Sequence, residues 1–153
     1  MTEAKNSKYD AQMSIEGLKV LVAEDNEMNM EIVSFILDNA GARTVGVSDG
    51  REALDTYMNS DANEYDVILL DIMMPVMDGY EATRQIRAID NSALSRVPII
   101  AMTANAFSED IQHSLTAGMN AHVSKPVEMK VLEKTIRSIK SGGGGTEPQV
   151  TVQ

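Results

Sequence analysis

Runs of consecutive aliphatic residues divide this chain into short segments that indicate buried strands. The clearest run lies between Asp66 and Asp71, where the four residues Val-Ile-Leu-Leu separate two acids. An uninterrupted run of this kind is typical of a strand that is covered on both faces, as in parallel sheets with helices on either side. Apolar segments at 18–23, 43–47, 97–102 and 121–123 predict four further strands.

Between these runs, apolar residues recur at helical spacing. The first such segment predicts a helix over 27–39, followed by a stop signal at Gly41. Asp78 has Glu81 three residues further on, as in a capping box, and therefore predicts the N-terminus of a third helix. The other predicted helices cover 51–58, 106–117 and 128–140.

The predicted helix over 106–117 should be the most weakly anchored of the five. Its apolar stripe is narrow and consists of Phe107, Ile111 and Leu115. A helix that buries so little apolar surface can shift at low cost, because few contacts resist its movement. This segment is therefore our candidate for an element that moves when the protein changes state.

Five alternations of strand and helix predict an α/β fold, a three-layer sandwich around a parallel five-stranded sheet. We expect the folded domain to span 17–140. The polar residues 1–16 are expected to form a flexible N-terminal segment. Residues 141–153 begin with a glycine run and have no apolar periodicity, which predicts a flexible Gly-rich tail or linker.

The chain is strongly acidic, with a formal net charge of −10 over 153 residues. This charge argues against direct binding to nucleic acid, whose phosphates require a basic face, and favours a cation or a basic partner. The absence of cysteine is compatible with a reducing cytoplasm. Because no signal peptide and no run of transmembrane length is present, we expect a cytoplasmic protein with no membrane contact by this chain.

Polar side chains follow four of the predicted strands where the chain leaves them. In chain order these are Glu24 and Asp25, Asp71, Thr103, and Lys125. Because the carboxyl ends of parallel strands meet at one edge of a sheet, where open α/β folds bind ligands, we expect these groups to converge. Taken alone, Asp71 could merely cap the turn that follows its strand. The convergence favours a functional site instead.

The expected cluster suits phosphoryl chemistry. Carboxylates that meet at one point repel one another, so they favour a hard divalent cation, Mg²⁺ or else Mn²⁺. Thr103 supplies a hydroxyl and Lys125 a compact positive charge, which together suit an anion that carries several oxygens. With the metal, these groups would stabilise a phosphoryl group in transfer, and Asp71 would be the nucleophile that forms an acyl phosphate.

Over residues 18–140 the chain resembles the receiver domains of two-component response regulators. The matching motifs are Glu24-Asp25-Asn26, Asp71 followed by Met74-Pro75 and Met77-Asp78-Gly79, Met102-Thr103-Ala104, and Lys125-Pro126. Each motif is weak alone, but all of them in order at strand ends form a specific signature. The chain is most similar to the receivers of hybrid sensor histidine kinases, although a stand-alone single-domain regulator fits nearly as well.

The resemblance implies a flavodoxin-like (βα)5 fold with strand order 2-1-3-4-5, which receivers share with flavodoxin. It also implies a phosphoacceptor regulatory domain, not an enzyme, that takes its phosphoryl group from a histidine kinase or a histidine phosphotransfer domain. Mg²⁺ would be held by Asp25, Asp71 and the backbone carbonyl of Met73, with Glu24 acting directly or through water. The residues implied for binding the phosphoryl group are Met73, Thr103, Ala104 and Lys125.

The resemblance further implies a conformational switch. In the family, the hydroxyl at the position of Thr103 moves toward the phosphate and an aromatic residue follows it. This alters the face made by the fourth helix, the fifth strand and the fifth helix, which contacts a downstream protein or a neighbouring domain. His122 occupies the aromatic position here. Two interpretations stay open: His122 takes part in the switch, or it is an exposed imidazole with no gating role. The isomer of the Lys125-Pro126 bond also stays open.

Two other functions fit the same architecture. A flavodoxin-type cofactor protein would need a Gly-rich phosphate loop after the first strand, where Glu24 and Asp25 would instead repel a phosphate. A receiver-like module that binds a partner without phosphorylation is the other alternative. The presence of Asp71, Thr103 and Lys125 together argues against it.

Overall fold

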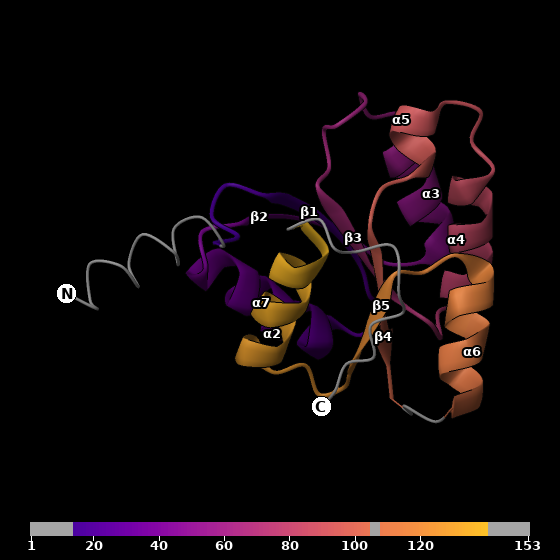
Figure 1. Cartoon of the computed structure of the whole chain (residues 1–153). Coiled ribbons are helices and arrows are strands. Elements are labelled where there is room, and N and C mark those ends of the chain that lie inside the picture. The colour runs from indigo at the N-terminus through magenta and orange to yellow at the C-terminus, as the bar shows by residue number, and fades with distance from the viewer. Residues whose placement is uncertain (1–13, 105–107, 141–153) are drawn as a thin grey trace.

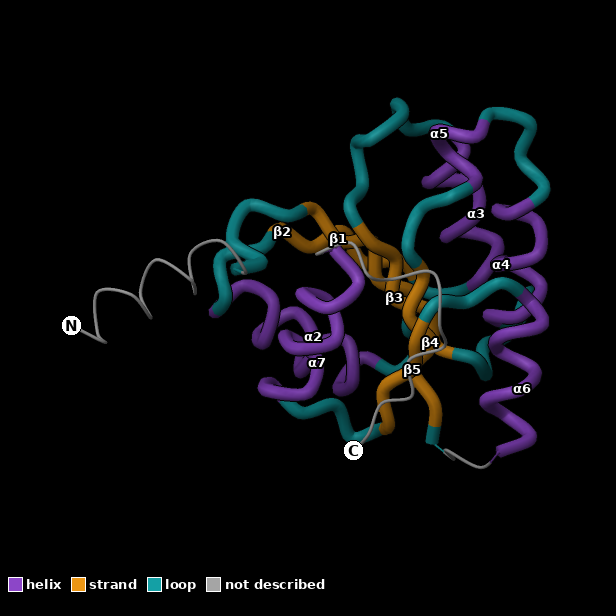
Figure 2. Tube along the Cα trace, in the orientation of Figure 1, coloured by secondary structure: helices purple, strands orange, loops and turns teal. Residues whose placement is uncertain are grey.

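The computed structural model describes residues 14–104 and 108–140. These residues contain one parallel sheet of five strands (Figure 1 and Figure 2). The strand order is β2-β1-β3-β4-β5, which confirms the predicted order. The strands are β1 (Lys19–Ala23), β2 (Arg43–Val47), β3 (Val67–Asp71), β4 (Ile99–Thr103) and β5 (Ala121–Ser124). Phe107, the predicted tail 141–153 and most of the predicted segment 1–16 lie outside the described residues. Ile15, from the end of that segment, packs in the core.

Helices cover both faces of the sheet, as the predicted three-layer sandwich requires. They are α2 (Glu27–Asn39), α3 (Gly50–Met58), α4 (Gly79–Arg87), α5 (Ser92–Ser95), α6 (Ser108–Ala117) and α7 (Met129–Ser138). Figure 1 shows α2 and α7 on one side of the sheet and α3, α4 and α6 on the other. The hydrophobic pattern does not indicate α5, because a single turn with no buried residue leaves no apolar period.

The burial of β3 on both of its faces explains why its sequence is aliphatic without interruption. All four aliphatic residues of the run are fully buried. Val67 and Leu69 belong to the core cluster on the side of α2 and α7, whereas Ile68 and Leu70 belong to the cluster on the side of α3 and α4. Alternate side chains therefore enter different hydrophobic cores, and burial of each one contributes about 1.5–3 kcal/mol.

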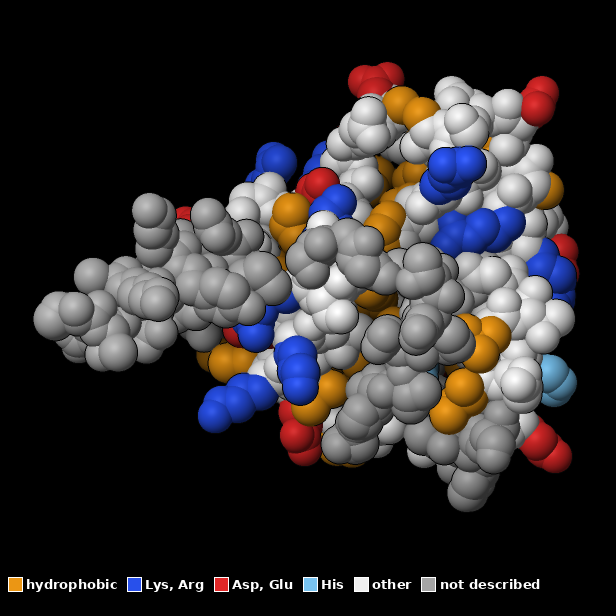
Figure 3. All heavy atoms as spheres, in the orientation of Figure 1, with side chains coloured by type: hydrophobic (Ala, Val, Ile, Leu, Met, Phe, Trp, Pro, Cys, Tyr) orange, Lys and Arg blue, Asp and Glu red, His pale blue; other side chains and the backbone are white. Residues whose placement is uncertain are grey.

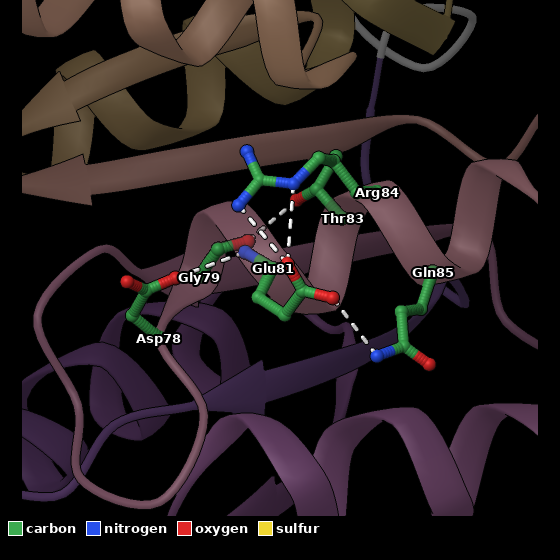
Figure 4. A network of polar contacts seen from close by, with 6 residues as sticks. All are labelled: Asp78, Gly79, Glu81, Thr83, Arg84 and Gln85. Atoms are coloured by element: carbon green, nitrogen blue, oxygen red, sulfur yellow. Dashed lines mark hydrogen bonds and ion pairs between the residues drawn. The ribbon is translucent and has the colours of Figure 1, made fainter.

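The predicted cap of α4 forms, but the capping box does not close. Asp78 accepts a hydrogen bond from the backbone N–H of Glu81 over 2.9 Å, as expected for an N-cap. The Glu81 carboxylate does not return to Asp78. It accepts hydrogen bonds from Arg84 and Gln85 one turn further along, both over 3.0 Å (Figure 4). Because these exposed side chains compete for the carboxylate, only the hydrogen bond to the Asp78 side chain forms, and the reciprocal bond of a capping box does not.

The register of the sheet brings the ends of the strands together. Ala23 at the end of β1 is paired with Leu70, and Asp71 at the end of β3 is paired with Met102. Thr103 at the end of β4 is paired with Ser124. Because all the strands run in the same direction, their carboxyl ends form one edge, and the residues that follow them lie within reach of one another.

Candidate phosphorylation and metal site

Three acidic side chains meet at the carboxyl edge of the sheet. Glu24 and Asp25 follow β1 directly, and Asp71 is the last residue of β3. One carboxylate oxygen of each residue lies within 4.8 Å of the corresponding oxygens of the other two. Glu24 and Asp71 are buried, whereas Asp25 is exposed, so the cluster opens toward solvent on the side of Asp25. The convergence expected from the strand ends is therefore present.

Lys125, which follows β5, inserts its ammonium group between the two buried acids. Its Nζ lies 2.9 Å from Oδ2 of Asp71 and 3.0 Å from Oε1 of Glu24. The backbone N–H of Lys125 donates to the carbonyl of Thr103 over 2.8 Å, which ties the chain after β5 to the end of β4. The Lys125-Pro126 peptide bond is cis. Lys125 thus neutralises part of the acidic cluster.

Glu24 keeps an acceptor without a donor among the described residues. Its Oε2 accepts a hydrogen bond from the backbone N–H of Asn26 over 3.1 Å. Its Oε1 is buried and, although it is 3.0 Å from the Lys125 ammonium, it is not aligned for a hydrogen bond. The contact is therefore an ion pair with an unused lone pair. A buried oxygen of this kind beside two further carboxylates fits the needs of a hard cation such as Mg²⁺.

Asp71 is held in an environment that disfavours its charge. Burial raises its pKa from 3.8 to about 6, and the negative charge of Glu24 adds to this effect. The hydrogen bond and the charge of Lys125, together with the backbone N–H of Met73, lower the pKa but do not outweigh burial. Burial also lowers the pKa of Lys125, yet its contacts with Asp71 and Glu24 outweigh this and raise it overall. The cluster therefore holds excess negative charge that a cation would stabilise.

The backbone around Asp71 adds further polar groups to this edge. The N–H of Met73 donates to Oδ1 of Asp71 over 3.2 Å, while the side chain of Met73 is exposed. Thr103 is buried at the end of β4, and Ala104 follows it at the surface. The structure thus brings every candidate metal-binding and phosphate-binding position to the same edge of the sheet.

His122 lies in β5, outside the ion-paired cluster. It is paired with Ala101 of β4 and is only 6% exposed, so the interpretation as an exposed imidazole is wrong. Burial lowers the pKa of His122, which favours the neutral imidazole.

A close backbone approach behind Asp71 was not among the expected site features. The N–H of Gly79 donates to the carbonyl of Ile72 over 3.0 Å, so the loop 72–78 returns against the strand that bears Asp71. A Cβ atom at Gly79 would lie 2.6 Å from the carbonyl oxygen of Asp71. Only glycine fits there without moving the site strand. The Met77-Asp78-Gly79 motif contains the signal for this contact, but the motif alone does not show which backbone group Gly79 approaches.

Comparison with known proteins decides the family. The sequence matches the family described as response regulator receiver domain over residues 20–137. The chain belongs to this family. The receiver domain is 41% identical over 122 residues to hybrid signal transduction histidine kinase I of Dictyostelium discoideum, a match that covers 78% of the chain. It spans only 7% of the length of that kinase.

Solved receiver structures share its fold. The receiver domain of sensor histidine kinase PA1611 from Pseudomonas aeruginosa has 40% sequence identity to it and a TM-score of 0.71, with 79% of this chain and 95% of that chain covered. That structure has a magnesium ion coordinated in its active site cleft. In the co-crystal structure of the Saccharomyces cerevisiae phosphotransfer protein Ypd1 with the receiver domain of Ssk1, the matched chain has 28% identity and a TM-score of 0.72. This match covers 80% of our chain and 88% of that one. The flavodoxin-like fold of the receiver domain is thereby confirmed.

Proposed function

We propose that Asp71 of this receiver domain accepts a phosphoryl group from a phosphohistidine on a histidine kinase or a histidine phosphotransfer protein. The observation that carries this proposal is the convergence of Lys125, Glu24 and Asp25 on the Asp71 carboxylate. A carboxylate oxygen of Asp71 would attack phosphorus while the bond between phosphorus and the imidazole nitrogen breaks. The nitrogen keeps the electron pair of that bond, and an acyl phosphate forms on the receiver.

The residues around Asp71 would bind the cation and the transferring phosphoryl group. Asp25, the carboxylate of Asp71 and the backbone carbonyl of Met73 would hold Mg²⁺, with Glu24 joining directly or through water. Mn²⁺ would suit the same oxygen donors. The bound cation supplies charge neutralisation for the transferring group. Lys125, the Thr103 hydroxyl and the backbone N–H groups of Met73 and Ala104 would bind the phosphoryl oxygens.

Apolar side chains beside the site offer a surface for the protein that donates the phosphoryl group. Met28, Ile32 and Phe35 are exposed at helical spacing on α2. Ile32 lines the same small cavity as Glu24 and Lys125, so this surface adjoins the candidate site. An exposed apolar stripe of this kind is typical of a protein contact. The phosphodonor would therefore contact α2 while its phosphohistidine reaches Asp71.

The conformational response to phosphorylation would involve the strands β4 and β5, which contain Thr103 and His122. Thr103 would move toward the phosphoryl oxygens, and His122 would respond within β5. This movement would alter the face made by α6, β5 and α7, which would contact a downstream protein or a neighbouring domain. The domain would then serve as a regulatory phosphoacceptor in the cytoplasm, with only its own phosphotransfer and slow dephosphorylation as chemistry. No helix within the described ranges has the length and apolar character needed to cross a membrane.

The first test measures phosphorylation with a small donor. Incubation of the full chain with acetyl phosphate and Mg²⁺ should give a single phosphoryl adduct by intact-protein mass spectrometry, because the acidic cluster needs a cation before it can accept another anion. Addition of EDTA should suppress the adduct, and Mn²⁺ added in excess should restore it. An adduct that forms equally well in EDTA would contradict the role proposed for the acidic cluster.

The affinity for Mg²⁺ should rise strongly between about pH 5 and about pH 7. The pKa of Asp71 is raised to about 6, so the group holds a proton at the lower pH, and Mg²⁺ must displace that proton in order to bind. An aspartate with an ordinary pKa of about 3.9 would be almost fully ionised at the lower pH and would show little rise. Isothermal titration calorimetry across this range measures the effect.

Asp71→Asn is the control for this pH dependence. It should bind Mg²⁺ more weakly at every pH, and its affinity should change much less over the same interval. A wild-type affinity that stays constant across the interval would show that Asp71 is not a ligand whose proton competes with the metal.

A further inference from the structure

We propose that Gly50, the first residue of α3, is a positioning residue for the cation site at Asp71. This inference rests on the proposed function, because the cation and the acyl phosphate share the Asp71 carboxylate. Gly50 is buried and is not a member of the acidic cluster. It acts through the loop 72–78, which connects β3 to α4. We call the backbone contacts of this loop segment at Gly50 and at Gly79 the glycine clamp.

Gly50 contacts the loop 72–78 directly through its backbone. Its N–H donates to the carbonyl of Met77 over 3.1 Å. A Cβ atom at Gly50 would overlap the carbonyl oxygen of Met77 and would lie 3.1 Å from that of Asp78. Rotation of a side chain cannot relieve such an overlap, because both atoms belong to the backbone. Any residue larger than glycine at this position must therefore displace either the loop or α3.

The second contact of the glycine clamp joins the loop to the strand that bears Asp71. The N–H of Gly79 donates to the carbonyl of Ile72 over 3.0 Å, and a Cβ atom at Gly79 would lie 2.6 Å from the carbonyl oxygen of Asp71. Met77, which contacts Gly50, is separated from Gly79 by a single residue. A displacement of the loop at Gly50 is therefore transmitted through Gly79 to the backbone of Asp71.

The start of α3 is held firmly, so it resists displacement. The side chain of Asp49 accepts a hydrogen bond from the N–H of Glu52 over 2.9 Å. The Glu52 carboxylate accepts in turn from the N–H of Ser48 over 2.8 Å. Hydrogen bonds in both directions fix the first turn of a helix, as in a capping box. The helix also buries Tyr57 in the core. An added methyl group at Gly50 would therefore displace the loop before it displaced α3.

The loop 72–78 depends on outside contacts for its conformation. Val76 has a φ angle of +70°, which is strained for a β-branched residue. The N–H of Met77 donates to the carbonyl of Pro75 over 2.7 Å and closes a tight turn around Val76. The side chains of Met73 and Val76 are exposed, so they contribute little packing to this part of the loop. A strained backbone persists only where its surroundings hold it, and the glycine clamp supplies such contacts.

The position of the loop matters to the cation because the loop provides backbone groups to the site. The N–H of Met73 donates to Oδ1 of Asp71 over 3.2 Å and orients that carboxylate. The carbonyl of Met73 is one of the proposed cation ligands. A metal site loses affinity when the groups that orient its ligands move. Substitution at Gly50 should therefore weaken cation binding in the folded protein, and not only lower its stability.

The test compares the affinity of the full chain for Mg²⁺ in two glycine variants. Gly50→Ala should bind Mg²⁺ about tenfold more weakly than the wild type by isothermal titration calorimetry. Circular dichroism checks that the variant is folded. Gly46→Ala, in β2, is the matched control. A Cβ atom at Gly46 would lie 3.0 Å from the flexible end of the Met30 side chain, which can move away. This variant should bind Mg²⁺ like the wild type.

Physiological ionic strength restricts the calorimetric signal to clustered acids. On the face that Figure 3 presents, Asp and Glu side chains lie apart from one another, with Lys and Arg side chains between them. Within the described ranges, the group of acids placed to share a cation consists of Glu24, Asp25 and Asp71. Salt screens the attraction of Mg²⁺ to the separate surface acids, so the measured affinity reports on this group.

A measurement on the wild type keeps the inference falsifiable if Gly50→Ala does not fold. Titration of the ¹⁵N-labelled full chain with Mg²⁺, followed by NMR, should shift the amide signal of Gly50, whose N–H is bonded to the loop. The amide signal of Gly46 should stay in place. A Gly50 signal that does not move would overturn the inference.

The outcomes also separate this inference from the proposed function. If the wild type binds Mg²⁺ and folded Gly50→Ala binds it equally well, the glycine clamp does not position the site, and the phosphoacceptor proposal stands. The same conclusion follows if Gly46→Ala weakens binding as much as Gly50→Ala. A wild-type chain that binds no Mg²⁺ would refute the cation site itself and this inference with it.

Discussion

Replacement of Asp71 by asparagine should abolish the phosphoryl adduct that acetyl phosphate and Mg²⁺ form on the wild-type chain. Asparagine has the same shape and keeps an oxygen that can accept the 3.2 Å hydrogen bond from the backbone N–H of Met73. It lacks the anionic oxygen that attacks phosphorus, so the chemical step is lost while the local backbone geometry is retained. Intact-protein mass spectrometry of both proteins under identical conditions measures the difference.

Asp78→Asn is the matched control for this substitution. Asp78 is an acid in the same β3–α4 connection, and its role is to cap α4 by accepting from the N–H of Glu81. Asparagine is as good an N-cap as aspartate, so this variant should fold normally and be phosphorylated like the wild type. An adduct of equal yield in Asp71→Asn would show that another carboxylate is the nucleophile, with Glu24 and Asp25 of the same cluster as the candidates.

Arg87→Met should destabilise the fold by about 3 kcal/mol. The Arg87 guanidinium donates to the carbonyls of Gly118, Ser95 and Val97 over 2.7–2.9 Å, and to Oδ1 of Asn120 over 2.9 Å. Methionine keeps most of the aliphatic packing of the side chain but removes every donor. Several partly buried acceptors then lose their partner at once, which costs more than an exposed ion pair. Urea-induced unfolding followed by circular dichroism measures the change.

Arg84→Met on the same helix separates this effect from loss of charge in general. Arg84 is exposed and pairs only with Glu81 among the described residues, one turn earlier on the surface of α4. Its replacement should change the free energy of unfolding by about 0.5 kcal/mol or less. If the two arginine variants were equally stable, the hydrogen bonds of Arg87 would not hold the amino edge of the sheet together.

The sequence predicted the strands and the edge of the site well because both depend on local rules. An aliphatic run such as that of β3 identifies a strand buried on both faces, since its alternate side chains enter two different cores. Parallel topology then places whatever follows each strand at one edge. The sequence alone therefore predicts that Glu24, Asp71 and Lys125 lie close together.

Several features depend on distant segments and could not be predicted in this way. The capping pattern at Asp78 indicated where α4 begins, but not that Glu81 would bond to Arg84 and Gln85 instead. Nothing local marks Arg87 as different from Arg84, because its acceptors lie up to 33 residues away in the chain.

The sequence by itself determined the α/β class, the positions of the five strands and the acids, hydroxyl and lysine that follow them. Hydrophobic periodicity and the order of residues along the chain contain this information. Tertiary structure alone decided that His122 is buried, that Lys125 pairs with both Glu24 and Asp71, and that the burial of Asp71 raises its pKa to about 6. Burial and charge pairing depend on distances between residues that are far apart in sequence, and only the packed fold sets those distances.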